Sequence, residues 1–208
     1  MKLLNLLLGL PALALAAPTS SVTPLLASRQ STPIQVTSVS ATGSGCPAGS
    51  WTIELSPDGQ TLLVAFNNYQ VAVGPGIPSS MRERTCDVTV GLSYPLGCTT
   101  ATIDNTYHGF AELHSGVSAT MSTQYSHSPG TVGPNPPPVT ISGAVWEDGN
   151  PFNKQDIVTT RLQATSSNQR VASYTIRTRA FVQTNNSQNF GTFTIDDLNV
   201  DIASQASC

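Results

Sequence analysis

The chain has 208 residues, a formal net charge of −3 at pH 7 and only 10% charged side chains. So weak a charge provides no basic field for nucleic acid or for an anionic membrane surface, and we expect neither as a partner. The length fits one domain of ordinary size with a core of its own.

The N-terminal residues 1–16 have the order of a secretory signal peptide. Lys2 precedes a leucine-rich apolar run, which ends in the small-residue site Ala14-Leu15-Ala16. This order predicts cleavage after Ala16 and a secreted, extracellular protein that keeps no membrane segment. A membrane anchor is the alternative, but it needs roughly 20 continuous apolar residues, and Thr19 interrupts the run earlier.

After the signal peptide, the chain divides into a short lead-in and one domain. Residues 17–33 are rich in Pro, Ser, Thr and Ala and are expected to be flexible or proteolytically processed. Beyond them, runs with period-two alternation recur between Gly, Pro, Asn and Asp clusters, which predicts one all-β domain over residues 34–208. We expect an antiparallel β-sandwich of about ten strands, disulfide-stabilised and with almost no helix. The expected strands lie at residues 34–41, 50–55, 61–66, 86–94, 99–104, 107–113, 117–125, 139–146, 157–165, 171–182 and 190–202.

Three connections are also predicted. A hairpin turn is expected at residues 56–59, where Gly59 can adopt a positive φ. Helix is confined to a turn around residues 79–84. The proline-rich residues 128–138 cannot pair inside a sheet and are expected to form a long surface loop.

All four cysteines follow the predicted cleavage site, and an even number on an oxidising route predicts two disulfides: the residues are Cys46, Cys86, Cys98 and Cys208. We favour Cys46–Cys208, which would close a long loop and remove about 4–5 kcal/mol of unfolded-state entropy, together with Cys86–Cys98. The second bond requires a chain reversal after Cys86. The competing pattern, Cys46–Cys86 with Cys98–Cys208, is preferred if the chain after Cys86 stays on one continuous strand.

Two groups of side chains resemble metal sites in their residue types. His108, Glu112 and His114 share a strand face, but the two histidines would lie about 20 Å apart along the strand, too far for one ion. Asp197 and Asp201 open a D-x-N-x-D pattern but lack the glycine and glutamate that complete a calcium loop. We therefore expect no metal and no cofactor.

No catalytic motif is complete in the sequence. Ser44 lies between two glycines but lacks the frame of a nucleophile elbow. Scattered carboxylates leave glycoside hydrolysis open, although nothing in the sequence selects a pair from Glu54, Glu83, Asp87, Asp104, Glu112, Glu147 and Asp148. Arg177 and Arg179 share one face of a predicted strand, and this small patch is expected to be a solvated face rather than a basic binding strip.

Several short motifs recur in order along the chain. They include Gly45-Cys46-Pro47, Ser56-Pro57-Asp58-Gly59, Gly74-Pro75-Gly76, Tyr94-Pro95-Leu96-Gly97 and Gly116-Val117-Ser118-Ala119-Thr120. On these motifs the chain resembles the secreted family called domain of unknown function 4360, over roughly residues 34–208. Cys98 and the segment Trp146-Glu147-Asp148-Gly149 depart from the family's pattern. The resemblance implies a secreted β protein and assigns no activity.

Secretion, disulfides and the absence of a catalytic motif predict a non-catalytic extracellular protein, and the family resemblance implies that its source is a filamentous fungus. We expect a binding or effector-like factor at the cell wall or host apoplast, whose partner is a host or cell-wall protein or a glycan. The alternative is an extracellular polysaccharide-active enzyme with a carboxylate pair that the sequence does not identify. Asn185 begins the chain's one N-x-S/T sequence, so an N-linked glycan is expected there.

Overall fold

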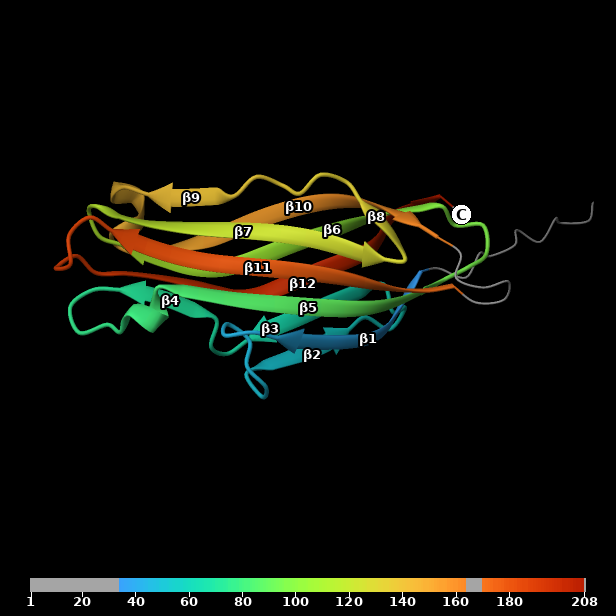
Figure 1. Cartoon of the computed structure of the whole chain (residues 1–208), viewed down its shortest axis with the longest axis horizontal. Helices are drawn as coiled ribbons and strands as arrows, with labels where there is room; N and C mark the ends of the chain where they lie inside the picture. The colour runs from blue at the N-terminus through green and yellow to red at the C-terminus, as the bar shows by residue number, and fades with distance from the viewer. Residues whose placement is uncertain (1–33, 164–169, 208) are drawn as a thin grey trace, which may run out of the picture. The chain divides into compact units, whose positions relative to one another are not determined.

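The computed structural model describes residues 34–163 and 170–207, which form two antiparallel β-sheets in a sandwich-like arrangement (Figure 1). This confirms the predicted all-β class. The described residues contain twelve strands and two 3-10 turns: β1 Gln35–Thr42, β2 Trp51–Leu55, β3 Thr61–Phe66, β4 Gln70–Val73, η1 Ser79–Met81, β5 Glu83–Tyr94, β6 Thr100–Leu113, β7 Val117–Ser128, β8 Gly130–Val132, β9 Val139–Ser142, η2 Ala144–Trp146, β10 Asn150–Leu162, β11 Arg170–Thr184 and β12 Gly191–Ser207.

The strands divide between the two sheets without following chain order. One sheet has five strands in the order β1-β5-β11-β7-β9. The other has seven, in the order β2-β3-β12-β6-β10-β8, and β4 pairs with β12 beside β3. Within the described residues every strand pairing is antiparallel, as the sandwich prediction required.

The core forms where the two sheets face each other. Burial alternates along each long strand, so that β6 and β11 bury every second residue and present the others on the outer face. Both sheets contribute fully buried side chains to the same cluster, among them Tyr107, Tyr174, Ile176, Phe193 and Leu198. Burying a large apolar side chain of this kind stabilises the fold by about 1.5–3 kcal/mol.

A cluster of polar side chains lies inside this apolar core. Lys154 and Asp156 face inward from β10, their side chains are only 3% exposed, and they form an ion pair. Asp156 also accepts hydrogen bonds from Tyr125 Oη (2.6 Å) and Thr123 Oγ1 (2.7 Å), both on β7 of the opposite sheet. Burial raises the pKa of Tyr125, so its hydroxyl stays protonated and able to donate. The cluster therefore ties the two sheets together through polar contacts at their centre.

The strand predictions were wrong where inward-facing polar residues break the apolar alternation. Residues 99–104 and 107–113 belong to one strand, β6, because Asn105 is fully buried and donates to Tyr174 Oη (3.1 Å) instead of forming a turn. β10 begins at Asn150 rather than at 157, since Lys154 and Asp156 occupy core positions that look like solvent positions in the sequence.

Other predicted boundaries also changed. Residues 128–138 are not wholly a loop, because β8 pairs with β10 within them. The expected strand at 139–146 ends at Ser142 and continues into η2. The hairpin at 56–59 is confirmed: Gly59 has φ 70° and donates its N–H to Ser56 O (2.9 Å).

The disulfide pairing that we favoured was wrong, because Cys46 is bonded to Cys86 with their Cα atoms 5.5 Å apart. β1 pairs antiparallel with β5, so the chain that leaves β1 lies beside the start of β5. Gly45 N donates to Thr85 O (2.8 Å), which fixes Cys46 next to Cys86. β5 then continues unbroken to Tyr94 and carries the chain away from Cys86. Cys98 is also disulfide-bonded, and Cys208 lies outside the described residues.

Candidate functional site

The outer face of the five-stranded sheet is covered by small hydroxyl-bearing side chains. They occupy alternate positions on neighbouring strands, and the strand register aligns them in rows. One row follows Ser126 on β7, Thr175 on β11, Thr89 on β5 and Ser40 on β1. Thr89 Oγ1 and Thr175 Oγ1 lie 3.2 Å apart within this row. The face is therefore polar across several strands while its inner side is packed in the core.

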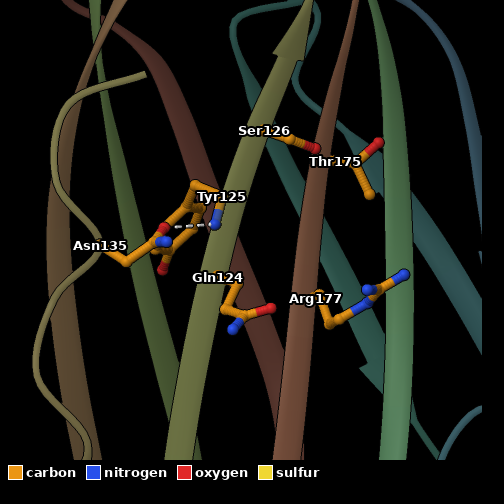
Figure 2. Close-up of a pocket in the computed structure, with 6 residues that line it drawn as sticks. All are labelled: Gln124, Tyr125, Ser126, Asn135, Thr175 and Arg177. Carbon is orange, nitrogen blue, oxygen red and sulfur yellow. Dashed lines mark hydrogen bonds between the residues drawn. The ribbon is translucent and has the colours of Figure 1, made fainter. Parts of the chain in front are cut away.

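A pocket of about 280 Å³ opens on this face (Figure 2). Its base consists of two register pairs, Ser126 with Thr175 and Gln124 with Arg177. The full lining is Gln124, Tyr125, Ser126, Asn135, Thr175 and Arg177. Because the ring of Tyr125 is buried with the core, that residue contributes mainly its backbone to the pocket. The remaining groups are hydroxyls, amides and one guanidinium, all of which can form hydrogen bonds with a ligand.

The loop after β8 supplies one wall of the pocket. β9 pairs with β7 only over Ser118–Met121, so the edge of β7 beyond that point has no partner strand among the described residues. Asn135 from the loop takes this place, since its Oδ1 accepts a hydrogen bond from Tyr125 N (2.8 Å), which Figure 2 shows as a dashed line. This contact covers the sheet edge and holds the loop beside Gln124 and Ser126.

Arg177 and Arg179 do not form a basic strip, because each is paired with an acidic residue on β5. Arg177 donates to Asp87 through Nε (2.9 Å) and Nη2 (2.7 Å). Arg179 donates to both carboxylate oxygens of Glu83 at 2.7 Å, and this guanidinium lowers the pKa of Glu83. The two pairs neutralise the face and fix the guanidinium plane of Arg177 at the pocket.

The residues considered as metal ligands form separate pairs. His108 Nδ1 lies 2.7 Å from Asp197 Oδ1, between β6 and β12, and Glu112 contacts His114 at 3.6 Å. Asp197 and Asp201 lie on β12, an extended strand, rather than in a calcium loop. Among residues 34–163 and 170–207 as described, no group of three or more His, Cys, Asp and Glu side chains lies close enough to hold a metal ion.

The scattered carboxylates do not meet across the pocket of Figure 2, whose lining contains none. Glu83 and Asp87 contact arginines, and Asp104 accepts from Gln155 Nε2 (2.5 Å). A second pocket, of about 340 Å³ beside the β2–β3 hairpin, has Glu54 as its one acidic lining residue. Neither pocket thus presents the two carboxylates of a glycoside hydrolase.

Of the residues that line the pocket, sequence analysis singled out Arg177 alone. Gln124 lies within the strand predicted at residues 117–125, but the sequence assigned it no role, and the structure places it on the outer face. Nothing in the sequence indicated that Asn135 lines a pocket, because its position depends on how the loop after β8 folds back against β7. Asn185, the predicted glycan site, is exposed in the turn between β11 and β12 and donates its N–H to Gly116 O (3.3 Å); its glycosylation stays a prediction.

Comparison with known proteins gives a family. The family model described as Domain of unknown function (DUF4360) matches residues 32–208. An uncharacterized secreted protein of Arthroderma benhamiae is 32% identical over 95 residues, which cover 46% of this chain and 39% of the relative. This secreted relative confirms the predicted extracellular localisation. The predicted signal peptide and the predicted lead-in lie outside the described residues, and within the described part no helix is long and apolar enough to span a membrane.

A solved structure, that of TmCBM61 in complex with beta-1,4-galactotriose, is 9% identical and covers 81% of this chain and 90% of its own. Its TM-score is 0.24. A score this low supports neither a shared fold nor a shared ligand.

Proposed function

We propose that this chain, which belongs to the DUF4360 family, is a secreted, non-catalytic protein that binds a neutral extracellular glycan through the pocket of Figure 2. It would act at the cell wall or in the host apoplast, in an effector-like role.

The observation that carries the proposal is the pocket's lining. Gln124, Ser126, Asn135 and Thr175 each offer hydrogen-bond donors and acceptors, which suits a ligand rich in hydroxyls. Arg177 adds a planar donor that Asp87 already orients, so less side-chain freedom is lost on binding. Because Asp87 balances its charge, the pocket favours a neutral sugar over an anionic one.

The size and setting of the pocket indicate the form of the glycan. Pockets for drug-sized ligands usually have about 300–1,000 Å³, so a pocket of about 280 Å³ fits one or two sugar units. The rows of hydroxyls beside it, such as Thr89 and Ser40, extend the polar surface across β5 and β1. A polymer would therefore place one unit in the pocket and lie along the face.

The proposal is tested by depletion of the purified mature protein from solution by insoluble β-glucan, chitin, cellulose and xylan. Gln124→Ala removes one amide from the pocket and is expected to weaken binding about fivefold, the effect of about 1 kcal/mol of hydrogen bonding. Gln183→Ala is the matched control, because Gln183 is exposed on the same face of β11 but outside the pocket, and its binding should equal that of the wild type.

Three outcomes would contradict the proposal. If no polysaccharide retains the protein and the protein captures one host protein, the partner is a protein. Equal binding of Gln124→Ala and Gln183→Ala would exclude the pocket. Release of soluble sugar from any polymer would identify an enzyme.

A further inference from the structure

The outer face of the seven-stranded sheet carries an exposed aromatic ring among polar groups. Phe110 faces outward from β6 and is 39% exposed, although an aromatic ring would normally be covered. Its register partner on β10 is Pro151, which is also exposed. Gly149 lies against the ring, since a Cβ at this residue would come within 2.3 Å of Phe110 Cζ. The two rings thus form a small apolar platform beside the β9–β10 connection.

A row of polar side chains lies next to this platform. Asn153 on β10, His108 on β6 and Asp197 on β12 are register partners across three strands. Asp197 Oδ1 lies 2.7 Å from His108 Nδ1, which assigns the proton of a neutral ring to Nδ1 and leaves Nε2 as an acceptor. His108 is about half exposed, with 48% of its side chain accessible, so the row presents an oriented imidazole and an amide to solvent.

The backbone of β12 is irregular at this place, and the irregularity brings Asp197 to the outer face. Phe193 and Ile195 face the core, and a regular strand would turn Asp197 inward as well. The register with β6 shifts between Ile195 and Asp197, which reverses the alternation and turns Leu198 inward instead. Such bulges redirect side chains beside functional sites. Gly109 permits the close approach, because a Cβ there would lie 2.0 Å from Thr194 O.

We propose that Phe110, Pro151, Asn153, His108 and Asp197, which we name the Phe110 platform, form a second sugar-binding site. A pyranose ring would stack its C–H face on Phe110 and place its hydroxyls against His108 and Asn153. His108 engages the Asp197 carboxylate through Nδ1 and turns Nε2 to the ligand, so the site offers hydrogen bonds and no cation for an anionic sugar, which suits the same neutral class of glycan. This inference rests on the proposed function for the class of ligand.

The Phe110 platform and the pocket of Figure 2 together would give one molecule two glycan-binding sites. The two sites lie on the outer faces of two different sheets, with the core between them. One molecule can therefore hold two polysaccharide chains at once. We infer that the protein bridges glycan chains, as an extracellular cross-linker of a polymer network.

The test measures bridging and binding separately on polysaccharide-coated beads of the polymer retained best. Wild-type protein should agglutinate the beads. Phe110→Ala should still bind through the pocket but lose agglutination, while the conservative Phe110→Tyr restores it. Ile157→Ala is the matched control, because Ile157 is an apolar residue 66% exposed on the same sheet face, and agglutination should be unchanged. Circular dichroism melting confirms that each variant is folded.

The outcomes separate this inference from the proposed function. Agglutination by Phe110→Ala at the wild-type level would overturn the second site while leaving the pocket intact. Loss of all binding in Phe110→Ala, with Gln124→Ala unaffected, would support the platform and overturn the pocket. Binding of wild type without agglutination would overturn bridging.

Discussion

At the scale of single residues, Asp156 is the side chain whose loss should cost the most. It is buried and accepts contacts from Lys154, Tyr125 and Thr123. Asp156→Ala would leave the Lys154 ammonium buried without a counter-charge, which typically costs about 3–5 kcal/mol of the free energy of unfolding. Urea unfolding measures this loss, and the exposed control Asp148→Ala should change stability by less than about 0.5 kcal/mol.

A double variant makes this prediction sharper. Lys154→Met with Asp156→Leu removes both charges and should recover much of the stability lost in Asp156→Ala. If the single and double variants are equally unstable, the pair matters through packing rather than through charge.

His127 gives the fold a pH dependence of known sign. It is 6% exposed, and burial lowers its pKa below the ordinary value of 6.5, against a smaller opposing effect of a hydrogen bond with the backbone of Pro129. The folded protein therefore keeps His127 neutral, whereas the unfolded chain takes up a proton below pH 6.5. Stability contributed by the neutral ring is present above this pH and is lost as the pH falls.

Thermal melting between pH 7.5 and pH 4.5 tests this account. The difference in Tm between His127→Leu and the wild type should shift in favour of the variant as the pH falls. A difference that stays constant across the range would show that His127 does not titrate in this way.

Asn185 is exposed in the turn between β11 and β12, as N-linked glycosylation requires. Enzymatic deglycosylation of fungal-expressed protein should lower its mass by one N-linked glycan. Asn185→Gln should show no such loss, and an unchanged wild-type mass would contradict the prediction.

At the scale of the elements, the sequence predicts strands well where the inward positions are apolar. β3 was predicted with its observed bounds, since Leu62, Val64 and Phe66 face the core at strict alternation. β4 and β8 were missed because strands of four and three residues are too short to show a period. The prediction divided β6 into two strands and made β10 too short. The buried polar residues of these strands find partners only in the folded sandwich, as Asn105 does with Tyr174.

The candidate sites were harder to predict than the strands. Outward alternation can place Gln124 and Arg177 on a face, but only the pairing of β7 with β11 sets them side by side. The Cys46–Cys86 disulfide likewise depends on the pairing of β1 with β5. The entropy of loop closure, which favoured Cys46–Cys208, does not depend on which strands pair.

The Cys46–Cys86 bond leads to a prediction about the N-terminal part of the five-stranded sheet. It spans a sequence separation of 40, for which loop entropy gives about 4 kcal/mol of stabilisation. Replacing both cysteines by serine should lower the free energy of unfolding by about this amount in guanidinium titration. Non-reducing peptide mapping should recover the Cys46–Cys86 pair, and a peptide that joins Cys46 to Cys208 would contradict the structure.

At the scale of the whole molecule, the sandwich gives a secreted chain two sheet faces, each supported from behind by the shared core. The outer face of the five-stranded sheet offers hydroxyls, amides and an oriented guanidinium, and that of the seven-stranded sheet offers a ring beside a polar row. Binding groups placed on rigid strands need little reordering when a ligand arrives. The fold thus supports the proposed recognition of an extracellular polymer.

The most direct test of this account is a titration of isotope-labelled protein with oligosaccharide fragments of the retained polymer, followed by amide chemical shifts. We expect progressive shifts at Gln124, Ser126, Thr175 and Arg177, around the pocket of Figure 2, with the fragments recovered intact. A saturating fragment that leaves these four amides unmoved, or that is cleaved during the titration, would contradict the account.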